Sequence, residues 1–94
     1  MIFAVLGIFR QPAPAYDPKV QAAFNEHLAQ PYLRIVNAGY LRGPQGEPIG
    51  LLALLDVKGL EQAQSFLDSS PFQMAGDYER TLVTAFDVSV GRLG

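Results

Sequence analysis

The sequence predicts a small α+β domain in which four strands form one sheet and two helices lie on one of its faces. Segments Ile2–Phe9 and Ile49–Val57 are apolar at both alternating sets of positions, which is typical of strands covered on both faces. Between and after them, apolar residues recur at three- and four-residue steps, which is typical of helices with one buried stripe. A chain of 94 residues is close to the commonest domain size, so we expect one domain, residues 1–94.

The first strand, Ile2–Phe9, ends before a proline-rich segment that cannot donate to a sheet ladder. A helix then begins at Asp17 and Pro18, because a carboxylate can cap the free N–H groups and proline suits the first helical position. Pro31 removes a hydrogen bond and predicts a kink, and Gly39 is a suitable end. The predicted buried stripe of this long helix comprises Val20, Phe24, His27 or Leu28, and Ile35.

A hairpin and a second helix follow. Tyr40–Gly43 is expected to be a short strand, and Pro44–Pro48 the turn that leads into Ile49–Val57. The second helix begins at Lys58-Gly59 and ends before Pro71, since the residue before a proline avoids helical geometry. One further helical turn, at 72–75, is expected before Gly76. The predicted buried stripe of the second helix comprises Leu60, Ala63, Phe66 and Leu67.

The last predicted strand is Thr81–Val90, whose inner side is expected to comprise Leu82, Phe86, Val88 and Val90. The order strand, helix, strand, strand, helix, strand is the ferredoxin-like plan, a βαββαβ order with both helices on one face of a four-stranded antiparallel sheet. Because two strands are apolar on both faces and the helices cover only one, the other face needs a partner. We therefore predict a homodimer.

Composition narrows the functional classes. The chain is 49% hydrophobic and 17% charged, which favours a sizeable protein–protein contact. A net charge of -2 with scattered basic residues argues against nucleic acid as a partner.

The absence of cysteine excludes disulfides, thiol catalysis and thiolate metal sites, and suits the cytoplasm. The apolar opening is too short to span a membrane. One histidine without cysteine argues against a metal site, so we expect neither a metal nor another cofactor.

His27 is the first candidate functional residue. It lies at the edge of the apolar stripe of the first helix, seven residues after Val20 and three after Phe24. A half-buried imidazole at that position could act as a general acid or base near neutral pH. The alternative is a structural histidine that packs its ring and bonds a nearby carbonyl.

Other polar side chains are weaker candidates. The segment from Asp68 to Phe72, which includes Ser70, is explained by simple helix punctuation. Asp77 belongs to a polar cluster before the last strand, where a solvated turn is expected but a carboxylate could reach a pocket. Tyr32 and Tyr40 could supply phenol hydroxyls, with core packing as the alternative.

Two long motifs and two short ones resemble a known family. Gly50–Leu67 (GLLALLDVKGLEQAQSFL) and Ser70–Gly76 (SPFQMAG) resemble the second half of the YciI-like (YCII-related) proteins. In these, a glycine opens an apolar strand, a Leu-Glu-x-Ala helix follows, and an Asp-Pro-Phe/Tyr-x-x-Ala-Gly stretch precedes the last strand. His27-Leu28 and Gly43-Pro44 are similar to motifs of the family's first half. The resemblance covers nearly the whole chain.

This resemblance implies a ferredoxin-like subunit of a dimeric α+β barrel. The family is thought to carry a His–Asp pair in a pocket, and related barrels include dehydrochlorinases and lactone isomerases that use no metal or organic cofactor. The family histidine corresponds to His27, whereas Ser70 replaces the aspartate and Leu51 replaces a serine that often follows the strand-opening glycine. Without the aspartate, His27 lacks the carboxylate that would orient it and raise its basicity.

The sequence thus yields two functional hypotheses. In the first, a pocket near His27 binds a small organic molecule, with Tyr32, Phe72 and Asp77 as substrate-binding residues. As an enzyme it would catalyse cofactor-free proton transfer, of the isomerase or lyase (dehydrochlorinase) type, with His27 as the base and Ser70 or Tyr32 as a hydrogen-bond donor. In the second, the protein is a non-catalytic dimeric binding or accessory protein that has lost the family's His–Asp pair. A larger ring-shaped oligomer is a further alternative to the dimer.

Overall fold

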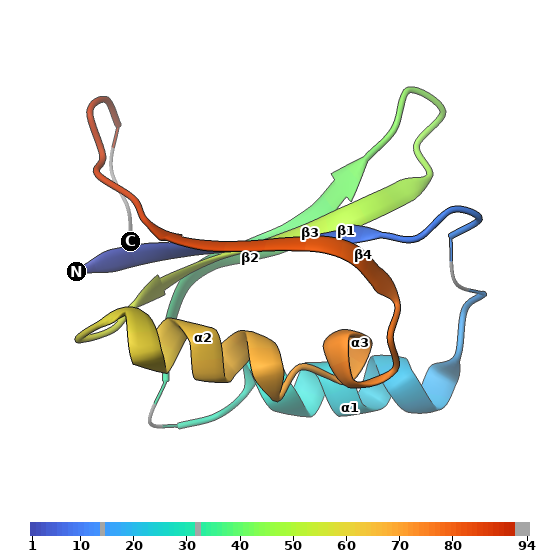
Figure 1. The fold of residues 1–94 in the computed structure, drawn as a ribbon, viewed down its shortest axis with the longest axis horizontal. Helices are drawn as coiled ribbons and strands as arrows, with labels where there is room; N and C mark the ends of the chain where they lie inside the picture. The colour runs from blue at the N-terminus through green and yellow to red at the C-terminus, as the bar shows by residue number, and fades with distance from the viewer. Residues whose placement is uncertain (14, 32, 92–94) are drawn as a thin grey trace.

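The computed structural model describes residues 1–13, 15–31 and 33–91. The sheet is antiparallel, in the order β2-β3-β1-β4, and the helices lie together on one of its faces, so the ferredoxin-like α+β fold is confirmed (Figure 1). In chain order, the elements are β1 (Ile2–Phe9), α1 (Pro18–Leu28), β2 (Arg34–Arg42), β3 (Pro48–Asp56), α2 (Leu60–Asp68), α3 (Pro71–Met74) and β4 (Tyr78–Ala85).

The two central strands have different surroundings on their two faces. The side chains of β1 and β3 that face the helices form the core together with the buried residues of the helices. On the opposite face, Leu6 lies in register with Leu52 of β3 and Leu82 of β4, so an apolar row crosses the sheet. The buried apolar and aromatic residues of strands and helices are Phe3, Val5, Phe9, Leu51, Ala53, Leu55, Tyr78, Phe24, Ala63, Phe66, Leu67 and Phe72.

Helix α1 begins where it was predicted to begin but ends earlier. The Asp17 carboxylate accepts a hydrogen bond from the Lys19 backbone N–H at 2.9 Å and caps the helix. The helix ends at Leu28, and the expected kinked continuation to Gly39 is wrong. Pro31 lacks the N–H that a continuing helix would need, and the segment after it gains ladder hydrogen bonds with β3 instead.

Strand β2 is therefore longer than the predicted Tyr40–Gly43. It begins at Arg34, and Ile35 approaches the core from the sheet, opposite Leu55 of β3, rather than from a helical stripe. The two-residue alternation of this strand is masked by three consecutive positions, Asn37, Ala38 and Gly39, that carry little apolar signal.

Strand β4 also differs from its predicted bounds, Thr81–Val90. It begins at Tyr78, opposite Phe9, and ends at Ala85, opposite Phe3, and the Phe86 N–H still donates to the Ile2 carbonyl at 2.9 Å, at the first residue of β1. The residues expected on the inner side of the strand are exposed: Leu82 points to the face opposite the helices, and the others lie beyond the strand. Their exposed fractions are 54% for Leu82, 42% for Phe86, 41% for Val88 and 93% for Val90.

The second half of the helical layer follows the prediction more closely. Ala63, Phe66 and Leu67 of α2 are buried as expected, whereas Leu60, at the first position of the helix, is 53% exposed. The expected extra turn is α3, and Gly76, with φ of 75°, adopts a backbone conformation that favours glycine and leads into β4.

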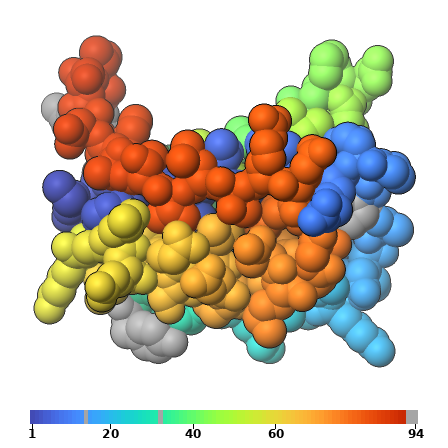
Figure 2. Space-filling view, viewed as in Figure 1, coloured from blue at the N-terminus to red at the C-terminus, as the bar shows by residue number. Residues whose placement is uncertain are grey.

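The face of the sheet opposite the helices lies between two projections. The β2–β3 hairpin and the segment after β4 both rise from the sheet on the side away from the helices (Figure 1). In the space-filling view they stand at the two ends of a saddle (Figure 2). The apolar row of Leu6, Leu52 and Leu82 crosses the sheet between these two elements.

Candidate functional site

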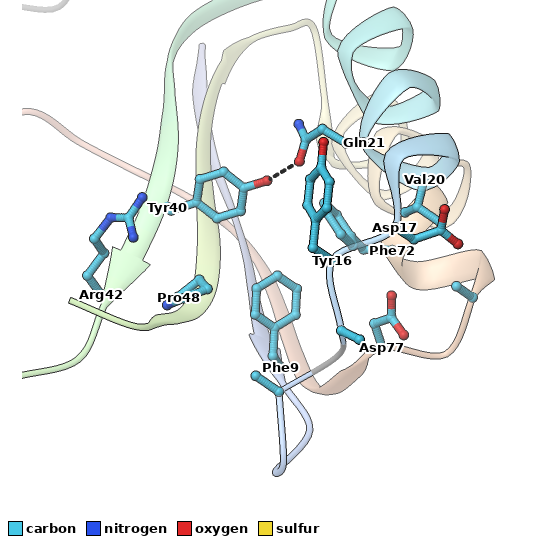
Figure 3. Close-up of a pocket in the computed structure, with 13 residues that line it drawn as sticks. Phe9, Tyr16, Asp17, Val20, Gln21, Tyr40, Arg42, Pro48, Phe72 and Asp77 are labelled. Atoms are coloured by element: carbon cyan, nitrogen blue, oxygen red, sulfur yellow. Dashed lines mark hydrogen bonds between the residues drawn. The ribbon is translucent and has the colours of Figure 1, made fainter. Parts of the chain in front are cut away.

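A pocket opens at the end of the molecule where the start of α1 faces β2. Its volume is about 570 Å³, within the range of small-molecule sites. Aromatic rings and Val20 line its interior, and polar side chains from α1, β2 and the segment before β4 surround it (Figure 3).

The floor of the pocket is a packed aromatic cluster. Phe9 of β1 and Phe72 of α3 line the pocket and meet edge to face, with ring centroids 5.3 Å apart. The Tyr78 ring stacks on Phe9 at 5.5 Å. Gly7 makes this stacking possible, because a Cβ atom at that position would overlap the Tyr78 ring. The floor therefore belongs to the packed core and offers the flat ring surfaces of Phe9 and Phe72.

One polar wall joins β2 to α1. The Tyr40 hydroxyl donates a hydrogen bond to Gln21 Oε1 at 3.0 Å, across the pocket mouth (Figure 3). The Gln21 amide nitrogen in turn donates to Asn25 Oδ1 at 3.1 Å, one turn further along the helix. These two bonds fix which end of the Gln21 amide faces the pocket.

The charged groups lie on opposite sides of the pocket. Arg42, at the end of β2, lines one side, and Asp17 and Asp77 line the other (Figure 3). The backbone of Asp77 is held firmly: its N–H donates to the Phe72 carbonyl at 3.0 Å, and its carbonyl accepts from the Arg10 N–H at 2.9 Å. The pocket therefore has one cationic and one anionic side.

His27 lies outside the lining of this pocket, in the core between α1 and α2. It is 7% exposed, and its ring stacks on that of Phe66 with centroids 4.4 Å apart. Nε2 lies 2.9 Å from the Phe66 carbonyl oxygen, and Nδ1 lies 2.9 Å from the Gln30 amide nitrogen. Since a carbonyl only accepts, Nε2 carries the proton and Nδ1 accepts from Gln30.

The protonation of His27 follows from this environment. Burial lowers the pKa of the imidazole from its ordinary value of 6.5, and the hydrogen bond to the Phe66 carbonyl opposes this effect. The neutral ring thus has both nitrogens bonded within the protein. This is the structural arrangement predicted as the alternative to a catalytic role.

Ser70 is buried at the start of α3, only 2% exposed, and its hydroxyl has no hydrogen-bond partner among the described residues. The structure contains no hydrogen bond between this hydroxyl and the Tyr78 phenol, although the hydroxyl influences the pKa of that phenol. Burial raises the pKa of Tyr78 to about 12, and the Ser70 hydroxyl acts in the opposite direction. Ser70 does not line the pocket.

Of the five predicted site residues, Phe72 and Asp77 line the pocket, and His27 and Ser70 do not. Tyr32 lies outside the described residues. Sequence reasoning missed Arg42 and Gln21, and it mentioned Tyr40 only as a phenol. A signal was present, since Tyr40 and Arg42 are two residues apart on one strand and so favour the same face.

A second hollow, of about 670 Å³, lies at the opposite end of the helical layer, beside Gln30 and Phe66. Both residues bond His27, but His27 itself does not line the hollow. Within residues 1–13, 15–31 and 33–91, no group of three or more His, Cys, Asp or Glu side chains is placed to hold a metal ion. No helix in this part of the chain is both long and apolar enough to cross a membrane.

The fold is similar to that of a solved enzyme. The structure of 5-chloro-2-hydroxyhydroquinone dehydrochlorinase (TftG) from Burkholderia phenoliruptrix AC1100, in complex with 2,5-dihydroxybenzoquinone, aligns with 93% of this chain and 94% of its own, with a TM-score of 0.73 and 19% sequence identity. At that identity the likeness establishes the shared fold. No protein-family model matches the sequence, and no curated protein matches it significantly.

Proposed function

We propose that this protein is a YciI-like member of the dimeric α+β barrels, and that it binds a small ring-shaped organic molecule in the pocket between α1 and β2. The observation that carries the proposal is the aromatic floor of Phe9 and Phe72 under a polar rim, in a cavity of about 570 Å³. Mostly apolar pockets with a few placed polar groups are the usual form of small-molecule sites. The quinone bound by the structural neighbour is a molecule of this kind.

Binding without turnover is the activity that the geometry supports best. Both nitrogens of His27 are bonded to other residues of the protein, and Ser70 offers no carboxylate to raise its basicity. Cofactor-free proton transfer of the isomerase or lyase type is the second candidate, supported by the family resemblance. It requires Gln30 to leave His27 Nδ1, after which the imidazole would face the hollow that Gln30 lines.

A pocket-filling variant tests the binding site. Ala75 lines the pocket and is exposed, so Ala75→Trp should fill the cavity without disturbing the core. Ala22→Trp places the same ring on an exposed position of α1 outside the lining and is the control. Ligand-observed NMR with hydroquinone and hydroxybenzoates should show binding to the natural protein and to Ala22→Trp, and its loss in Ala75→Trp. Equal binding by all three proteins would place the site elsewhere.

The enzymatic candidate has its own test. Once a ring ligand is found, its turnover is compared between the natural protein and His27→Gln, which keeps a side chain able to donate to the Phe66 carbonyl. The binding proposal predicts that no product forms with either protein. Turnover by the natural protein that His27→Gln abolishes would instead establish the proton-transfer enzyme.

We also propose that the protein is a cytoplasmic homodimer, paired through the face of the sheet opposite the helices. Support comes from the apolar row of Leu6, Leu52 and Leu82, which the helices leave uncovered. Leu82→Glu places a charge in this row at a residue that is 54% exposed in the single chain, so the subunit itself should fold. Leu60→Glu, on a residue 53% exposed on α2, is the matched control.

Light scattering distinguishes the outcomes. The natural protein and Leu60→Glu should have twice the 10.2 kDa mass of one chain, and Leu82→Glu should shift toward the single-chain mass. A monomeric natural protein would contradict the dimer, and a larger mass would indicate the ring-shaped oligomer.

A further inference from the structure

The guanidinium of Arg42 is a cation at the mouth of the pocket, and most of its hydrogen-bonding capacity is unused. A guanidinium has five N–H donors, and here Nη1 donates to the Gly46 carbonyl at 2.7 Å. The guanidinium carbon lies 5.9 Å from the centroid of the Tyr40 ring. The Gly46 carbonyl and the Tyr40 ring therefore position the guanidinium, and neither neutralises its charge.

No carboxylate neutralises Arg42 within the described part of the chain. The ion pairs found there both involve Asp56, which contacts the N-terminal ammonium and Arg34, each at 3.1 Å. Asp17 and Asp77 are the acidic residues of the pocket, and they lie on the side away from Arg42 (Figure 3). Asp17 already caps α1 through Lys19, which leaves the Asp77 carboxylate as the acceptor available to a ligand.

A ligand that fits this pocket carries different polar groups at its two ends. An anionic group at one end of a flat ring would satisfy Arg42, and a hydrogen-bond donor at the other end would satisfy Asp77, while the ring lies on Phe9 and Phe72. A carboxylate matches the planar fork of a guanidinium with two parallel hydrogen bonds, which a neutral amide cannot reproduce. A ligand without an acid would cover the cation with no partner, which costs binding free energy.

We propose that Arg42 is the specificity-determining residue of the pocket, and that it selects aromatic acids whose ring carries a hydroxyl or amino group opposite the carboxylate. This inference rests on the proposed binding function and names its ligand class. The Asp77 carboxylate accepts the hydrogen bond of the distal donor.

The test compares an acid with its neutral isostere. Calorimetry measures the binding of para-hydroxybenzoate and para-hydroxybenzamide to the natural protein, Arg42→Gln and Arg34→Gln. Arg34 is an exposed arginine at the other end of the same strand and is the control. The natural protein and Arg34→Gln should bind the acid at least about tenfold more tightly than the amide. Arg42→Gln should lose this preference and keep its affinity for the amide.

Two results would overturn the inference. Equal affinity of the natural protein for acid and amide, or an undiminished preference in Arg42→Gln, would show that Arg42 does not select the ligand, while the pocket itself would still stand. Binding of neither compound, nor of hydroquinone, would overturn the pocket as well.

A second comparison tests the opposite end. Asp77→Asn should weaken the binding of para-hydroxybenzoate several-fold. It should leave the affinity for plain benzoate, which has no distal donor, unchanged. An equal loss for both acids would assign Asp77 to the support of the pocket rather than to recognition of the hydroxyl.

Discussion

The two ends of the space between the helices and the sheet are built from similar residues and differ in how their polar groups are used. At the His27 end, the imidazole is enclosed by Phe24 and Phe66, and both of its nitrogens are bonded. At the pocket end, aromatic rings again form the interior, but Arg42 and Asp77 keep unused hydrogen-bonding capacity. A polar group that is fully bonded within the protein stabilises the fold, whereas a pocket-lining group with unused hydrogen-bonding capacity is available to a ligand.

The sequence predicted the histidine and the ligand pocket at one place, and the structure separates them. His27 was predicted to mark the pocket, and the structure puts a cavity at the other end of α1, beside Asp17 and Gln21. The catalytic roles predicted for His27 and Ser70 remain predictions. The contacts of His27 are those of a residue that holds α1 against α2.

The largest expected difference between the two ends is in stability. Phe24→Ala removes a ring that is 2% exposed and packs against Phe72 at 4.9 Å, and should lower the free energy of unfolding by about 3–5 kcal/mol. Tyr40→Phe, at the pocket mouth, should change it by about 0.5 kcal/mol or less. Urea unfolding at one fixed protein concentration measures both. If Phe24→Ala lowered the free energy of unfolding by less than about 1 kcal/mol, the two ends would not differ in their contribution to stability.

The second prediction concerns acid. Because the pKa of His27 is lowered in the folded chain, the unfolded chain takes up a proton first as the pH falls below about 6.5. Stability should therefore fall as the pH decreases from about 6.5 to the folded-state pKa, and remain unaffected by this group above that window. His27→Gln lacks the group, so its unfolding free energy should fall less between about pH 7 and pH 5. Parallel curves for the two proteins would mean that His27 titrates normally.

The third prediction concerns alkali, at the floor of the pocket. The pKa of Tyr78 is raised to about 12, so above pH 10 the unfolded chain loses the phenol proton before the folded chain does. The stability that Tyr78 contributes should be present below about pH 10 and decline as the pH approaches 12. In Tyr78→Phe this decline should be smaller. Chemical unfolding at several alkaline pH values tests it, and an equal decline in both proteins would show that the phenol is not shielded.

The smallest expected effect is at Ser70. Its buried hydroxyl has no partner within the described residues, so Ser70→Ala loses no hydrogen bond and should change the unfolding free energy by less than about 0.5 kcal/mol, or raise it slightly. Ser69→Ala is the control, because the Ser69 hydroxyl donates to the Ser65 carbonyl at 2.8 Å. A cost of more than about 1 kcal/mol for Ser70→Ala would reveal a hydrogen bond at this hydroxyl.

Where local chemistry is decisive, the sequence predicted the structure well. The Asp17-Pro18 start of α1, the two strands that are apolar on both faces and the turn at Gly76 each depend on a few neighbouring residues. The predictions for β2 and β4 failed where the partner strand sets the bounds. Pro31 could either bend or end a helix, and pairing with β3 settled the matter. In the same way, β4 ends close to the first residue of β1, the strand with which it pairs.

By itself, the sequence determined the order of the elements, the ferredoxin-like plan and the uncovered apolar face, because periodicity and capping act over a few residues. Only the tertiary structure decided the pocket. Its groups come from distant parts of the chain, Gln21 on α1, Arg42 on β2 and Asp77 before β4, and they meet because the sheet order β2-β3-β1-β4 and the packing of α1 bring them to one end. No local pattern encodes that meeting, since it depends on which strands pair and where each helix lies on the sheet.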